Sequence, residues 1–93
     1  MTISKCQKGE NLYKNRAQDG RCNISGRKIA ALRKSSKPKM SQRALADQLQ
    51  LAGLDLDKNA IQKMESGERF ITDIELKAIA ALFGVTADEL LKE

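Results

Sequence analysis

Beyond the first quarter of the chain, apolar residues recur three or four positions apart, which is the spacing of one face of an α-helix. Ile29 and Leu32 predict a first helix over residues 25–35. This helix is expected to end before Pro38, because a proline disfavours the helical conformation in the residue before it. Residues 1–23 lack the helical period, and we interpret them as a polar, basic and partly disordered N-terminal arm.

Cap residues and glycines delimit two further helices in the middle of the chain. Ser41 is a favourable N-cap, and the helix that it begins is expected to end at Gly53, where glycine suits a left-handed cap. Asp57 is expected to cap a third helix over residues 58–66, which Gly67 ends.

Two capping boxes, in which a threonine is followed three residues later by a glutamate, predict the last two helices. Thr72 and Glu75 begin the first of them. Thr86 and Glu89 begin a shorter helix near residue 90. The fold class is therefore expected to be all-α, a compact bundle of five short helices.

The composition agrees with packed helices and excludes several classes of function. Aromatic residues make up 3% of the chain, which is few for a β-sandwich or barrel. The longest apolar run, residues 78–83, is far shorter than the ~20 residues of a membrane span. The chain has no histidine, no glycine-rich phosphate loop and no catalytic triad. We therefore expect neither an enzyme nor a cofactor, a metal or a small-molecule ligand.

The two cysteines, Cys6 and Cys22, are too few to complete a four-ligand zinc site. A disulfide between them is one alternative, and two reduced thiols are the other. The chain begins without an apolar signal segment, which indicates a cytoplasmic protein. Because the cytoplasm keeps thiols reduced, we favour the reduced form.

Positive charge is concentrated in the first part of the chain. Residues 1–40 hold 11 lysines and arginines against two acidic residues, whereas residues 41–93 hold six against ten. A basic segment of this kind favours a polyanion such as nucleic acid, or an anionic membrane surface. The membrane is the less favoured partner, because no segment combines a strong apolar face with a polybasic one.

The outward face of the helix at 58–66 is suited to reading base edges. Ala60, Ile61 and Met64 are expected to point inward. The outward residues include no carboxylate: they are Lys58, Asn59, Gln62, Lys63 and Ser66. Asparagine and glutamine form paired hydrogen bonds with adenine, and lysine donates to guanine. Any soluble helix has a polar outer face, so this pattern alone barely distinguishes DNA binding from solvation.

Four motifs follow one another along residues 26–91 in an order typical of one family. In single-letter code they are GRKIAALR at 26–33, MSQRALA at 40–46, AIQKMESG at 60–67, and IEL followed by AALFGV between 74 and 85. In these motifs the chain resembles the lambda-repressor/Cro type of helix-turn-helix domain, the xenobiotic-response-element (XRE) family of bacterial and phage regulators. The resemblance implies a lambda-repressor-like bundle within residues 24–93, whose second and third helices form the helix-turn-helix.

The resemblance also implies roles for individual residues. Base reading is expected from Lys58, Asn59, Gln62 and Lys63. Phosphate contacts are expected from Ser66, from the backbone around Gly67 and from Arg69. Gln42 is expected to contact a phosphate or an outer base, assisted by the helix N-terminus. Basic residues that flank or follow the start of the second helix are expected to add phosphate contacts: Lys37, Lys39 and Arg43. Arg33 and Glu65 match a largely buried ion pair of the family, the alternative being two surface charges of little effect.

Three features depart from the family pattern, and one of them is the loop from Ser35 to Lys39, which is slightly longer than usual. The connection between the second and third predicted helices is several residues longer than usual, so either the second helix is extended or the connection is a real loop. The arm 1–23 has no counterpart in the family. We favour a mobile tail over a basic arm that touches DNA or packs through Tyr13.

These features predict sequence-specific binding of double-stranded DNA by a transcriptional regulator, acting as a repressor. The family usually acts as homodimers on half-sites ~34 Å apart, and we expect the same of this chain, in the cytoplasm and at the nucleoid. The alternative is an antitoxin-like or regulatory protein-interaction module that uses the same fold. Acidic residues of the last two helices would then form the interaction surface.

Overall fold

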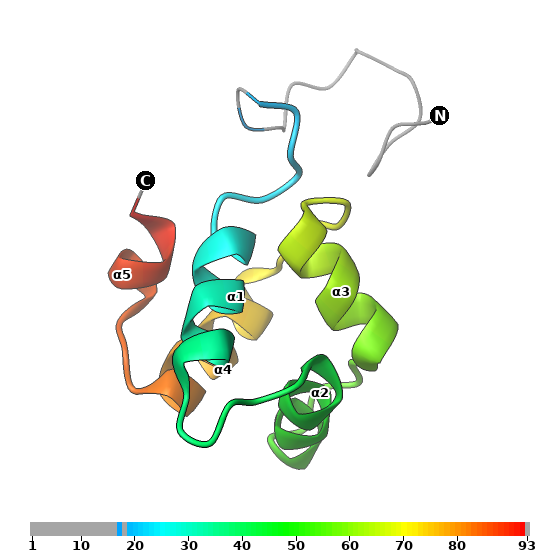
Figure 1. Ribbon diagram of the computed structural model, residues 1–93. Coiled ribbons are helices and arrows are strands. Elements are labelled where there is room, and N and C mark those ends of the chain that lie inside the picture. The colour runs from blue at the N-terminus through cyan, green and yellow to red at the C-terminus, as the bar shows by residue number, and fades with distance from the viewer. Residues whose placement is uncertain (1–16, 18, 93) are drawn as a thin grey trace.

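The computed structural model describes residues 17 and 19–92, which form five helices and no strand (Figure 1). The helices are α1 (Gly26–Ser35), α2 (Gln42–Leu51), α3 (Lys58–Ser66), α4 (Asp73–Phe83) and α5 (Ala87–Leu91). α3 packs against both α1 and α2, and α4 packs against α2 and α5. The all-helical bundle predicted from the sequence is confirmed.

α2, α3, α4 and α5 begin directly after the cap residues that the sequence predicts. The side chains of Ser41, Asp57, Thr72 and Thr86 each accept the backbone N–H three residues further along, at 2.8–3.2 Å. The capping box of α4 is complete, because Glu75 also accepts the N–H of Thr72 at 3.0 Å. Each cap satisfies a backbone donor at a helix start and contributes about 1 kcal/mol to stability.

The long connection between α2 and α3 is a real loop. α2 ends at Leu51, and Gly53 follows with a left-handed φ of +97°. Leu56 is 3% exposed and joins the hydrophobic core, so it holds the loop against the bundle. The side-chain amide of Gln50 donates to the carbonyl of Leu56 at 2.8 Å. Of the two alternatives left by the sequence, the structure therefore has the loop.

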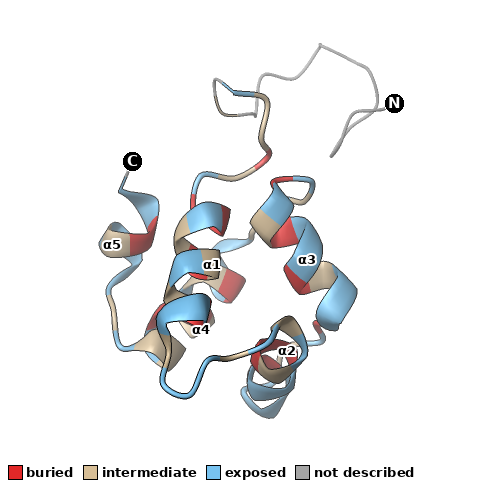
Figure 2. Cartoon of the chain, viewed as in Figure 1, coloured by how far each residue is buried: buried red, intermediate tan, exposed pale blue. Residues whose placement is uncertain are grey.

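Every helix contributes to one hydrophobic core, seen as the buried inner sides of the ribbons in Figure 2. The fully buried apolar side chains are Ile29, Leu45, Leu49, Ile61, Met64, Ile79 and Leu90. Leu90 belongs to the short α5, which therefore closes the core, whereas the neighbouring Leu91 stays 43% exposed. A shared core of this kind holds α3 in a defined place in the bundle.

The structure differs from the expectation of two reduced thiols, because Cys22 is disulfide-bonded. Cys22 is 5% exposed, and its N–H donates to the carbonyl of Gly67 at 2.9 Å. The expectation rested on the redox compartment, whereas disulfide formation depends on how the folded chain places its sulfur atoms. Cys6 and most of the predicted arm, residues 1–16 and 18, lie outside the described residues.

None of the described helices is long and apolar enough to cross a bilayer. The described residues include no group of three or more histidine, cysteine, aspartate or glutamate side chains that could hold a metal ion.

Candidate nucleic-acid interface

α3 is buried along one side and open along the other. Ile61 and Met64 are fully buried, and Ala60 packs against the same core. The exposed residues are those that the sequence places outward: Lys58, Asn59, Gln62, Lys63 and Ser66. Figure 2 shows this exposed side of α3 facing away from the bundle. The helix therefore presents amide, ammonium and hydroxyl groups to solvent, with no exposed carboxylate among its residues.

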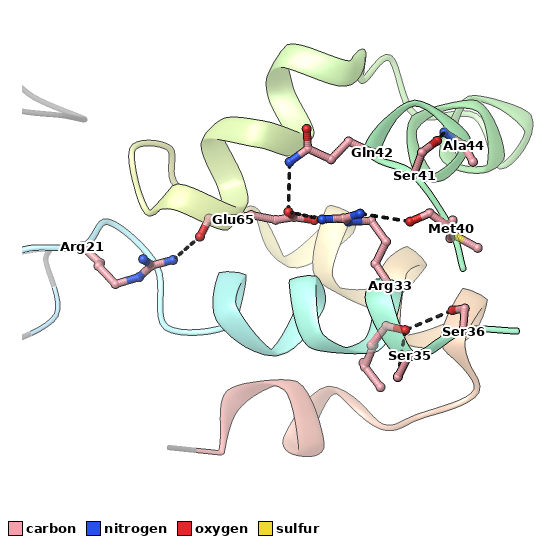
Figure 3. Close-up of polar contacts among 10 residues, drawn as sticks. Arg21, Arg33, Ser35, Ser36, Met40, Ser41, Gln42, Ala44 and Glu65 are labelled. Atoms are coloured by element: carbon pink, nitrogen blue, oxygen red, sulfur yellow. Dashed lines mark hydrogen bonds and ion pairs between the residues drawn. The ribbon is translucent and has the colours of Figure 1, made fainter. Parts of the chain in front are cut away.

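Arg33 of α1 and Glu65 of α3 form a buried ion pair (Figure 3). Nε of Arg33 donates to Oε2 of Glu65 at 2.7 Å, and Nη2 donates to Oε1 at 2.9 Å. The two side chains are 10% and 8% exposed. Nη1 of Arg33 also donates to the carbonyl of Met40 at 3.0 Å. This guanidinium therefore joins α1, α3 and the chain that leads into α2.

Gln42, the first residue of α2, contacts the same carboxylate. Its Nε2 donates to Oε1 of Glu65 at 3.0 Å, which links the start of α2 to α3 (Figure 3). An amide nitrogen has two hydrogens, so the second N–H of Gln42 remains available to a phosphate. The phosphate contact of Gln42 stays a prediction.

Three basic residues surround the start of α2. Lys37 and Lys39 are exposed in the loop between α1 and α2, and Arg43 is exposed in the first turn of α2. No acidic residue lies in that turn, and the helix N-terminus adds partial positive charge. The side chain of Gln42 contacts Glu65, so the start of α2 lies beside the end of α3.

The predicted phosphate contacts after α3 have different surroundings. Ser66 is exposed, and its hydroxyl donates to the carbonyl of Lys63 at 3.2 Å. Gly67 is buried and ends α3 with a left-handed φ of +88°. Its N–H donates to the carbonyl of Met64 at 3.2 Å. Of these two residues, only Ser66 has a side chain that faces solvent.

Arg69 forms an ion pair with Glu75 at the start of α4. Its Nη1 and Nη2 donate to the two carboxylate oxygens at 2.9 and 3.1 Å. Burial raises the pKa of the Glu75 carboxyl, but the hydrogen bonds from Arg69 and Thr72 outweigh burial, so the pKa lies below its ordinary value of 4.5. The guanidinium is therefore engaged within the fold, and its phosphate contact stays a prediction.

The sequence of this bundle matches a known family over most of its length. A helix-turn-helix family model matches residues 29–90. The chain belongs to the helix-turn-helix family of the lambda-repressor/Cro type. This family consists of DNA-binding transcription regulators. No curated protein and no solved structure matches the chain.

The helix-turn-helix domain also has contacts that sequence reasoning missed. Arg21 and Asn23 precede the residues that match the family model, yet their side chains donate to backbone carbonyls at the end of α3. The partners are 44 and 41 residues away along the chain. No helical period or cap motif signals a contact over such a separation, so only the tertiary fold reveals it.

Proposed function

We propose that this helix-turn-helix protein binds double-stranded DNA at specific sequences and acts as a transcriptional repressor of bacterial or phage type. The main support is α3, whose inner side is buried while its outer side exposes lysine, asparagine and glutamine without a carboxylate. A helix that enters the major groove needs such a side, because base edges present both hydrogen-bond donors and acceptors.

The proposed contacts divide between two parts of the surface. Base edges are read from α3 by Lys58, Asn59, Gln62 and Lys63. Phosphates are contacted around α2 and after α3 by Lys37, Lys39, Gln42, Arg43, Ser66, Gly67 and Arg69. The first group supplies sequence discrimination, and the second supplies affinity and register on the duplex. Residues 24–93 form the DNA-binding domain in this proposal.

We further propose that the protein acts as a homodimer in the cytoplasm, at the nucleoid. A two-fold dimer matches an operator with two inverted half-sites, spaced ~34 Å apart so that both α3 helices enter the same side of the duplex. The half-site arrangement recovered by a binding selection therefore reports on the dimer as well as on the base contacts.

A selection from randomised DNA duplexes tests this function. The full chain is expected to enrich one motif with inverted half-sites, and to bind it more tightly than a shuffled duplex of equal length. Affinity for both duplexes should fall steeply as salt rises, because bound phosphates release their counterions. Failure to enrich any motif, with negligible binding to both duplexes at low salt, contradicts DNA binding and favours the protein-interaction alternative.

A further inference from the structure

Arg21 lies across the C-terminal end of α3. Its Nη2 donates to the carbonyl of Glu65 at 2.7 Å, and its Nη1 donates to the carbonyl of Ser66 at 3.1 Å. Figure 3 shows the guanidinium reaching from the chain before α1 to the backbone of α3. The last carbonyls of a helix have no partner within it, and a cation there also interacts favourably with the helix dipole. Arg21 therefore acts as a cap supplied from another part of the chain.

Asn23 connects the same end of α3 to the start of α1. Its Oδ1 accepts the N–H of Gly26 at 2.8 Å. Its Nδ2 donates to the carbonyls of Met64 and Arg69 at 3.0 and 2.7 Å. One side chain thus satisfies a donor at the N-terminus of α1, an acceptor in the last turn of α3 and an acceptor in the loop that follows α3. It therefore holds the start of α1 close to the end of α3.

Two glycines provide the space that these contacts need. A Cβ at Gly26 would collide with the carbonyl oxygen of Met64, and a Cβ at Gly67 would lie 2.8 Å from Cγ of Arg21. The N–H of Cys22 adds a bond to the carbonyl of Gly67 at 2.9 Å. Residues 21–23 therefore fit closely against α3 through both backbone and side chains.

We propose that Arg21 and Asn23 are positioning residues that set the orientation of α3 in the DNA groove and thereby determine its sequence discrimination. This inference rests on the proposed function. Both residues precede the matched segment 29–90, so the family model does not cover the side chains that donate these hydrogen bonds, although it covers the carbonyls that accept them. Paired hydrogen bonds to a base require accurate placement of α3, whereas attraction to phosphates tolerates a small rotation.

The test uses variants that remove the contacts to α3 while sparing nearby ones. Asn23→Asp keeps the oxygen that accepts the N–H of Gly26 but loses the donor to α3, and Gln48→Glu makes the same charge change on an exposed residue of α2. Arg21→Gln shortens the side chain and removes the guanidinium that donates to the carbonyls of Glu65 and Ser66. Its control is Lys77→Gln, which removes one positive charge from an exposed residue of α4. Each full-length protein is measured against the selected duplex and the shuffled duplex over a range of salt, and its thermal unfolding is recorded.

Asn23→Asp and Arg21→Gln are expected to lower the ratio of selected to shuffled affinity by about tenfold, roughly the loss of one paired base contact. Both control variants should keep the wild-type ratio. Partial unfolding cannot mimic this result, because a smaller folded fraction weakens binding to both duplexes equally. If Asn23→Asp does not fold, Arg21→Lys is used instead, since it keeps the positive charge but loses the planar guanidinium whose two nitrogens donate to separate carbonyls.

Three outcomes overturn the positioning role. Wild-type ratios in both variants mean that these contacts do not orient α3. An equal loss on both duplexes with a shallower salt dependence makes Arg21 a phosphate contact instead. If the wild-type chain itself selects no site, the proposed function fails, and the positioning role fails with it; this result differs from the first two, in which the wild type still discriminates.

Discussion

Arg33 donates to both carboxylate oxygens of Glu65, and neither side chain is more than 10% exposed. Burying two charges costs about as much free energy as their attraction returns, so the intact pair adds little net stability. Loss of one partner is different, because the remaining charge stays buried without compensation. The pair therefore matters chiefly for holding α1 against α3.

Replacing Arg33 by methionine is expected to destabilise the protein by about 3–5 kcal/mol, the usual cost of breaking a buried pair from one side. Glu65 would keep its bond from Gln42 but lose both guanidinium bonds. Urea unfolding followed by circular dichroism measures the change in the free energy of unfolding.

The double variant Arg33→Met/Glu65→Met should recover most of the lost stability, because it leaves no buried charge unpaired. Lys34→Met, at an exposed neighbour on α1, serves as the control and should change stability little. A double variant as unstable as Arg33→Met alone would show that the ion pair itself supplies the stability.

Replacing Asn59 by alanine should weaken binding to the selected duplex by about 1–3 kcal/mol while leaving the shuffled duplex nearly unaffected. The same applies to Lys63→Ala, with an additional small loss of general affinity because a positive charge is removed. Fluorescence anisotropy titrations with both duplexes give the two affinities. Gln48→Ala, on an exposed part of α2, is the control. A uniform loss on both duplexes would reassign Asn59 to the DNA backbone.

Lys37 and Lys39 should act on affinity rather than on discrimination. Each is exposed in the loop before α2, where it contacts a phosphate in our proposal. Lys37→Ala and Lys39→Ala should each reduce the slope of log affinity against log salt by about 0.9 and weaken both duplexes alike. The control Lys77→Ala, on α4, should leave the slope unchanged. If Lys37→Ala or Lys39→Ala also leaves the slope unchanged, that lysine does not contact a phosphate.

The helices were predictable because local chemistry determines where they begin and end. Ser41 and Asp57 cap α2 and α3 through a backbone N–H only three residues away. Gly67 and Gly84 end α3 and α4 in the left-handed conformation that favours glycine. Each of these signals lies within a few residues, so the sequence alone was sufficient.

The surroundings of the candidate site were less predictable, because they depend on contacts between distant segments. Arg69 is predicted to contact a phosphate, and the sequence does not indicate that its guanidinium also pairs with Glu75 at the start of α4. The disulfide bond of Cys22 and the hydrogen bonds from Arg21 to α3 likewise depend on how the chain before α1 packs against the bundle. The residue types alone indicate the exposed face of α3. The hydrogen bonds that Arg21 and Asn23 donate to its last turn are seen only in the tertiary structure.

The pair of Glu75 and Arg69 makes stability depend on acid pH. The pKa of Glu75 is lower in the folded protein than its ordinary value of 4.5, so between these two values the unfolded chain binds more protons than the folded one. Stability therefore rises with pH in that interval. The contribution of Glu75 is fully present above about pH 5 and is lost as the pH falls below 4.5 through the folded value.

Glu75→Gln should therefore lower the melting temperature at pH 7 and flatten its decline toward pH 3, because the variant has no carboxylate to protonate at this position. Asp73→Asn removes a carboxylate from the same helical turn, but that residue is exposed, so this control should retain the wild-type decline. Thermal unfolding at half-unit pH steps separates the two variants. Equal pH dependence in wild type and Glu75→Gln would mean that the pair with Arg69 does not hold the Glu75 carboxylate charged in the folded protein.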